Sequence, residues 1–175
     1  MKRFFIFLLK PLSFIPALLI VYMIFMFSTQ DGATSSALSY KVSYHIVSIG
    51  GKVLDMDLSE EQISRYVVRF HGPIRKIAHM VQYFALAVAV SFPLYVYKLR
   101  GFPLMLVAGF ICVGIACLDE YNQTLTTGRG GSTNDVLIDS IGIFCGITLV
   151  RMVCWTALSG SRRRARVATR RNKRK

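Results

Sequence analysis

The fold is decided by residues 77–97, which read IAHMVQYFALAVAVSFPLYVY and contain no Asp, Glu, Lys or Arg. At about 1.5 Å per residue, a helix of this length spans about 32 Å, close to the thickness of the hydrocarbon core of a bilayer. Comparable apolar runs cover residues 12–27, 102–118 and 136–155. A soluble fold could not bury four such runs in 175 residues. The sequence therefore predicts an all-α, multi-pass membrane protein whose core is a four-helix transmembrane bundle.

The first run could instead be a signal peptide, because Lys2, Arg3 and Lys10 precede it. Its apolar stretch is long, however, and Ala33-x-Ser35 is a poor cleavage site. We therefore expect an uncleaved helix.

Charge is distributed unevenly along the chain. The formal net charge is +13, and nine of the 22 Lys and Arg residues lie in the last 14 positions. With the N-terminus inside the cell, no Asp or Glu faces the cytoplasm and all nine acids lie outside, as the positive-inside rule demands. We therefore predict that the N-terminus and the C-terminus are both cytoplasmic.

The chain divides into a membrane domain over residues 1–155 and a basic tail over residues 156–175. We expect the tail to be disordered in solution and attracted to anionic lipid, at about 1 kcal/mol per basic residue near the surface. Nucleic-acid binding is not expected, because the adjacent membrane explains such a basic run more simply.

The first outer loop, residues 28–76, predicts two short amphipathic helices. One face of the first helix carries Leu38, Val42, His45, Ile46 and Ile49, and Gly50-Gly51 would end it. Ser59 and Gln62 form a capping box that begins the second, which His71-Gly72-Pro73 would end. Its apolar stripe consists of Ile63, Tyr66, Val67 and Phe70. We expect both helices to lie on the outer leaflet; a small soluble subdomain is the alternative.

Polar side chains gather at the outer ends of the predicted spans. Arg75, His79 and Tyr83 share one helical face, and Asp135 and Asp139 are four residues apart. The predicted ligand-binding or polar cluster comprises Gln30, Arg75, His79, Tyr83, Asp119, Glu120, Gln123, Arg129, Asp135 and Asp139. An unpaired charge inside a bilayer costs about 2.5–3.5 kcal/mol, so we expect Asp139 to pair with Arg75, Arg129 or a protonated His79.

Two glycines continue the stripe of the last span below Asp139. Gly142 and Gly146 form a GxxxG pattern, which lets another helix backbone approach closely. Small residues below and charged residues above predict a cup that opens outward.

Several motifs resemble the VanZ-like family of bacterial membrane proteins. They are Phe27-Ser28-Thr29-Gln30, Arg75-x-x-x-His79-x-x-Gln82-Tyr83-Phe84, Asp119-Glu120-x-x-Gln123, Gly128-Arg129 and Asp135-x-x-x-Asp139-x-x-Gly142. Two positions depart from the family pattern: Gln82 stands where Glu is usual, and Asn122 where His is frequent. The first departure removes an acid from the cup and weakens proton-transfer roles built on it.

The founding member of that family is associated with resistance to the lipoglycopeptide teicoplanin. The resemblance therefore implies a bacterial cytoplasmic membrane protein whose ligands come from the outer leaflet or from cell-wall precursors. The favoured function is non-catalytic binding of a lipidated envelope ligand, with anion contacts from Arg75, Lys76 and Arg129.

Three alternatives stay open. The protein could be a small enzyme acting on a lipid head group, with His79 or Glu120 as acid–base catalyst. The polar network could serve helix register alone. Transport is less favoured, because four helices without a repeat would need to oligomerise. No cofactor or metal is expected, since the four cysteines lie within apolar runs and lack ligand spacing.

Overall fold

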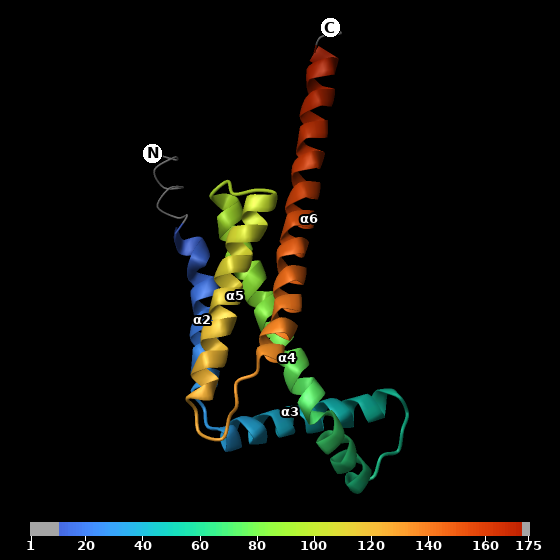
Figure 1. The fold of residues 1–175 in the computed structure, drawn as a ribbon. Coiled ribbons are helices and arrows are strands. Elements are labelled where there is room, and N and C mark those ends of the chain that lie inside the picture. The colour runs from blue at the N-terminus through green and yellow to red at the C-terminus, as the bar shows by residue number, and fades with distance from the viewer. Residues whose placement is uncertain (1–10, 173–175) are drawn as a thin grey trace.

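The structure is a computed structural model that describes the backbone of residues 11–172 and the side chains of residues 11–156. Its elements in order are η1 (Pro11–Phe14), α2 (Ile15–Ser28), α3 (Gly32–Val53), α4 (Glu60–Val96), α5 (Phe102–Thr124) and α6 (Thr133–Asn172). Helices α2, α4, α5 and α6 run side by side, and α3 crosses one end of this bundle (Figure 1). The connection between α5 and α6 lies at the same end, which we call the site end.

Four segments are long and apolar enough to span a membrane: Pro11–Ser28, Glu60–Val96, Phe102–Thr124 and Thr133–Thr156. Large apolar side chains such as Leu18, Phe110 and Phe144 point away from the protein and are exposed. Exposed apolar surface of this extent is what lipid contact requires and water disfavours. The predicted all-α bundle with four spans is therefore confirmed.

Helix α4 lies at the centre of the bundle and packs against α2, α3, α5 and α6. Its side chains Tyr83, Leu86 and Ala87 are fully buried. The core that surrounds them is built from Ala17, Ile24, Ala108, Cys112, Ala116, Ile143 and Ile147. The polar residues at the site end therefore rest on a packed apolar core.

The contact between α4 and α6 depends on two glycines. A Cβ atom on Gly142 would overlap the carbonyl oxygen of Met80, and one on Gly146 would lie 2.6 Å from the carbonyl oxygen of Phe84. The backbones of the two helices therefore touch without side chains between them. Gly142 lies three residues after Asp139 and Met80 directly follows His79, so this contact also sets the height of the polar groups above it.

The outer loop differs from its predicted form. The capping box of Ser59 and Gln62 is present, but the helix that it begins does not end at His71-Gly72-Pro73 and continues to Val96. Proline removes one backbone hydrogen bond, and packing can offset that loss. Here Ile63 and Val67 are buried in the first part of the helix, which packs against α3. The second amphipathic helix and the second span are thus one helix, α4.

The first amphipathic helix, α3, is longer than predicted. It passes through Gly50-Gly51 and ends at Val53, and the left-handed residue of the following turn is Asp55. Gly51 packs against Leu58, so its missing side chain makes room for the returning chain. The apolar residues Leu38, Val42, Ile46 and Ile49 are exposed along α3, as expected for a helix that lies at a membrane interface.

The basic tail also differs from the expectation of disorder. Helix α6 continues beyond the last span to Asn172. Residues 156–172 contain no proline and are rich in Ala and Arg, which favour helix. The remaining residues of the tail, 173–175, lie outside the described part of the chain.

We predict that Gly142→Ala lowers the stability of the bundle by about 1–3 kcal/mol, because the added methyl group forces α6 away from α4. Thermal unfolding of the purified protein in detergent measures this loss. Gly114→Ala in α5 is the matched control, since a Cβ atom there meets nothing within 4 Å. Equal stability of the two variants would contradict the predicted backbone contact.

Candidate functional site

The site end contains a polar cavity with a volume of about 270 Å³. It is lined by residues of α4, α5, α6 and the α5–α6 connection: Gly72, Arg75, Lys76, His79, Glu120, Gln123, Gly128, Arg129, Gly130, Asp135, Ile138 and Asp139. Three bases, three acids and a histidine thus face one space. Side chains from three of the four spans therefore meet in this cavity, whereas the first span contributes none of its lining residues.

A second hollow, which we call the apolar groove, lies beside the polar cavity and has a volume of about 210 Å³. Its walls come from α2, α3, α4 and α5, and include Ile24, Phe27, Leu38, Val42, Ile74 and Ala78. Arg75, His79, Gln123 and Arg129 line both hollows. These four polar residues therefore form the boundary between the polar cavity and the apolar groove.

Asp119 is the centre of a buried hydrogen-bond network below the site. The hydroxyl group of Tyr83 donates to Asp119 Oδ2 at 2.9 Å, and Gln123 Nε2 donates to the same oxygen at 3.2 Å. Ser28 Oγ donates to the Asp119 carbonyl oxygen at 3.3 Å and accepts from Asn122 Nδ2 at 3.2 Å. A buried carboxylate needs hydrogen-bond donors, and the donors to Asp119 come from α4 and α5. Together with the contacts of Ser28, this network joins α2, α4 and α5.

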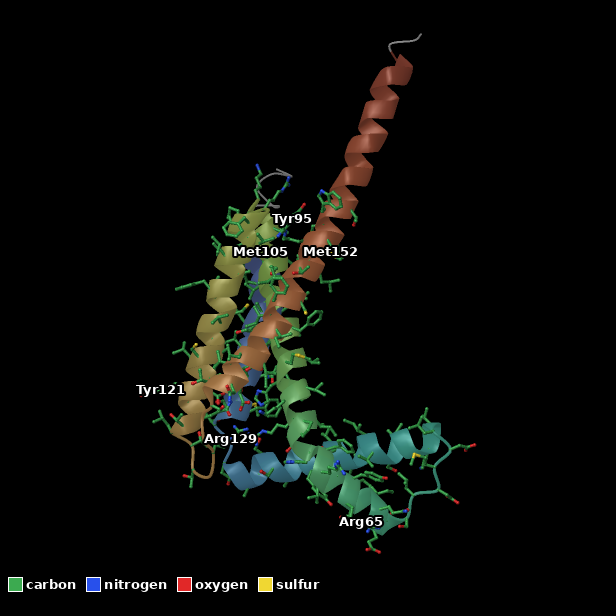
Figure 2. All side chains as sticks on the ribbon, turned by 45° about the vertical axis from the view of Figure 1, so that its right-hand side comes forward. Arg65, Tyr95, Met105, Tyr121, Arg129 and Met152 are labelled. Atoms are coloured by element: carbon green, nitrogen blue, oxygen red, sulfur yellow. The ribbon has the colours of Figure 1, made fainter. Side chains whose placement is uncertain are left out.

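Arg129 ties the α5–α6 connection to the first two helices (Figure 2). Its Nη1 donates to the carbonyl oxygens of Phe27 and Ser28 at 3.0 and 3.1 Å, and its Nη2 donates to Ser35 Oγ at 2.6 Å. The two carbonyls belong to the last turn of α2, where helix carbonyls lack intrahelical partners. Burial lowers the pKa of Arg129, and the nearby positive charge of Arg75 adds to this effect. Arginine nevertheless stays protonated in proteins, so it serves here as a fixed donor.

The connection also approaches α3 closely through glycine. The amide of Gly32 donates to the carbonyl oxygen of Thr127 at 3.0 Å, and a Cβ atom on Gly32 would overlap the carbonyl group of Gly128. Gly128 itself has a positive φ of 75°. Glycine at both positions lets the connection close over the start of α3.

The acids of the polar cavity differ in how they are satisfied. Glu120 Oε1 accepts a 2.5 Å hydrogen bond from the amide of Ser132. Asp135 Oδ1 lies 3.2 Å from Lys76 Nζ, an ion pair held by charge rather than by an aligned hydrogen bond. Asp139 is only 2% exposed, and its Oδ1 has no hydrogen-bond partner within the described residues. The ion pair predicted for Asp139 is thus absent from the described part of the chain.

The structure brings most of the predicted cluster together. Arg75, His79, Glu120, Gln123, Arg129, Asp135 and Asp139 all line the polar cavity. Gln30 and Asp119 line the apolar groove instead, and Tyr83 lies beneath both, where it is fully buried against Asp119. Gly142 and Gly146 lie deeper, between α4 and α6.

Sequence reasoning missed the apolar groove and the residues that hold α3 in place. The spacing of Leu38 and Val42 predicts an apolar face of α3, but it does not indicate that this face forms one wall of a groove. His71, which the sequence analysis placed only at the end of a helix, lies with its Nε2 2.7 Å from Ser39 Oγ and so links α4 to α3. Within the described residues, no group of His, Cys, Asp and Glu is arranged to hold a metal ion.

We predict that Arg129→Lys destabilises the site end by about 1–3 kcal/mol, because one ammonium group cannot reach all three acceptors that the guanidinium group contacts. Thermal unfolding in detergent is the measurement. Arg65→Lys is the control, since Arg65 is exposed near the start of α4, far from the cavity (Figure 2). A loss no greater than that of the control would refute the role of Arg129.

Comparison with known proteins supplies a family. No curated protein and no solved structure matches the chain significantly. Residues 13–155, however, match the family model described as VanZ/LLP1. This range includes nearly all of the four spans, and it includes both hollows and every residue of the predicted polar cluster. The resemblance found in the sequence motifs is therefore confirmed, and the chain belongs to the VanZ/LLP1 family.

Proposed function

We propose that the protein binds an envelope amphiphile at the site end, with a head group that contains a phosphate or carboxylate in the polar cavity and a hydrocarbon chain in the apolar groove. The observation that carries this proposal is Arg75. It is half-buried, lines both hollows, and makes no hydrogen bond or ion pair with any residue from 11 to 156.

The guanidinium group of Arg75 keeps contact with solvent, since none of its nitrogen atoms is both buried and without a partner. The other two bases of the cavity are engaged: Lys76 with Asp135, and Arg129 with the carbonyls of α2. Arg75 therefore keeps its donors for a ligand, and its planar fork fits a phosphate or carboxylate in a bidentate manner.

The apolar groove would bind the hydrocarbon chain of the ligand. It adjoins the polar cavity through Arg75 and His79, and its other side includes Leu38 and Val42 of α3. Each methylene group that leaves water contributes about 0.8 kcal/mol. A ligand with both parts would gain affinity from two adjacent hollows that neither part could fill alone.

The charge distribution supports an outward-facing site. The basic tail follows α6 at the far end of the bundle, and the positive-inside rule places such a tail in the cytoplasm. The polar cavity would then open toward the outer leaflet. Its ligand would be an envelope lipid, a lipid-linked cell-wall precursor or a lipoglycopeptide, all of which combine polar or ionised groups with a hydrocarbon chain.

We predict that Arg75→Gln weakens binding of an anionic phospholipid at least about tenfold, because a hydrogen bond between charged partners contributes about 1.5–3 kcal/mol. Titration of the purified protein with short-chain phosphatidylglycerol measures this change. Arg69→Gln makes the same substitution on the same helix at an exposed position outside both hollows. Equal affinity in the two variants would refute the proposal.

The same site can be tested in cells. A deletion strain carrying Ala at Arg75, His79, Glu120, Asp135 or Asp139 would be compared with the parent for susceptibility to lipidated and non-lipidated glycopeptides. Increased susceptibility of the variants to the lipidated compounds alone would support a lipoglycopeptide as ligand. An unchanged phenotype in all five variants would exclude glycopeptides as the relevant ligand.

Catalysis is a second candidate, favoured by the position of His79. This residue lines both hollows, so it would lie beside the junction of head group and chain. Because an acid–base catalyst needs a titrating imidazole, His79→Gln should abolish turnover while Arg75→Lys reduces it only partly. Under binding alone, Arg75→Lys should weaken affinity at least as much as His79→Gln. Incubation of each variant with labelled phospholipid, followed by product analysis and titration, separates the two functions.

A further inference from the structure

We infer that the head group bound in the polar cavity is zwitterionic, with a primary ammonium group held by Asp139 and a phosphate or carboxylate held by Arg75. This inference rests on the proposed function and names the class of head group within it. It concerns Asp139, the acid of the polar cavity that has no partner among the described residues.

Asp139 is a buried acid that faces an open space. Its side chain is almost fully enclosed by the protein, yet it lines the polar cavity and its Oδ1 has no hydrogen-bond partner among the described residues. Buried carboxylates ordinarily have partners, since an unpaired one is costly in a low-dielectric setting. The cavity is therefore the direction from which a donor would reach Asp139.

The other two acids of the polar cavity have partners: Glu120 accepts from the Ser132 amide, and Asp135 pairs with Lys76. Asp119 lines the apolar groove instead; its Oδ2 accepts from Tyr83 and Gln123, while its Oδ1 has no hydrogen-bond partner among the described residues. Within the polar cavity, Asp139 is therefore the acid available to a ligand. Arg75 is likewise the base available to one.

Arg75 and Asp139 do not satisfy each other. No ion pair joins them, so their charged atoms are more than 4.0 Å apart although both line the same cavity. A purely anionic head group would reach Arg75 but would bring its charge near Asp139 and be repelled. A head group that carries an anion and an ammonium group a few atoms apart would satisfy both residues at once.

The cavity has room for such a group. Its volume of about 270 Å³ equals that of about nine water molecules at about 30 Å³ each. Phosphoethanolamine has the required chemistry: a phosphate, a two-carbon spacer and a primary ammonium group. The matched probe without the cation is phosphoglycerol, in which neutral hydroxyl groups replace the amine.

The experiment titrates the full-length protein in detergent micelles with short-chain phosphatidylethanolamine and with phosphatidylglycerol of identical chains. We expect phosphatidylethanolamine to bind about tenfold more tightly. Asp139→Asn should remove this preference by weakening phosphatidylethanolamine binding, without weakening that of phosphatidylglycerol. Asp57→Asn, the same substitution at an exposed position outside both hollows, should keep the preference.

The failures of the two proposals are distinguishable. Equal affinity for the two lipids, or a preference that survives Asp139→Asn, would overturn the zwitterion inference and leave amphiphile binding intact. The preference of the unmodified protein decides the matter even if the variant does not fold. Failure of the unmodified protein to bind either lipid, or affinities unchanged by Arg75→Gln, would overturn the proposed function. Soluble phosphoethanolamine that competes as well as the intact lipid would refute a role for the apolar groove.

Discussion

The close contact between the backbones of α4 and α6 governs the rest of the structure. Gly142 and Gly146 allow it, because any larger side chain would collide with carbonyl groups of α4. Helices that touch in this way have little freedom to slide or rotate against each other. The contact therefore fixes Asp139 at the height of His79 and Arg75, and a polar site can form from residues that are 60 or more positions apart.

A second constraint comes from the low dielectric environment of a bundle. Most polar groups there have partners within the protein: Asp119 Oδ2 accepts from Tyr83 and Gln123, and Arg129 donates to the carbonyls of α2, although Asp119 Oδ1 and Arg129 Nε lack partners among the described residues. Arg75 and Asp139 differ from these two groups, because neither makes a hydrogen bond or ion pair with residues 11–156. If these two residues served only to fix the register of the helices, an ion pair between them would be the most effective arrangement. Under the proposed function, their separation leaves both side chains able to contact a ligand.

The sequence predicted the spans and the shared depth of the polar residues, because both follow from one-dimensional patterns. Apolar length gave the helices, and the order of the helices placed Arg75, Glu120, Asp135 and Asp139 at one end. The pairing of these residues could not be predicted, since it depends on helix rotation and on backbone acceptors that no sequence pattern marks. The three acceptors of Arg129 are an example: two are carbonyl oxygens and one is a serine hydroxyl. The continuation of α4 through Pro73 was missed because burial of Ile63 and Val67 outweighs a local helix-breaking signal.

The length of α6 changes what its basic extension can do. At about 1.5 Å per residue, a straight helix carries residue 162 about 10 Å beyond Trp155 and residue 170 about 22 Å beyond it. Figure 1 shows α6 continuing past the ends of the other helices along its own direction. Electrostatic attraction is screened over about 8 Å at physiological ionic strength. The backbone at the far end of α6 therefore lies more than two screening lengths from Trp155, so its electrostatic surroundings are set independently of those of the last span.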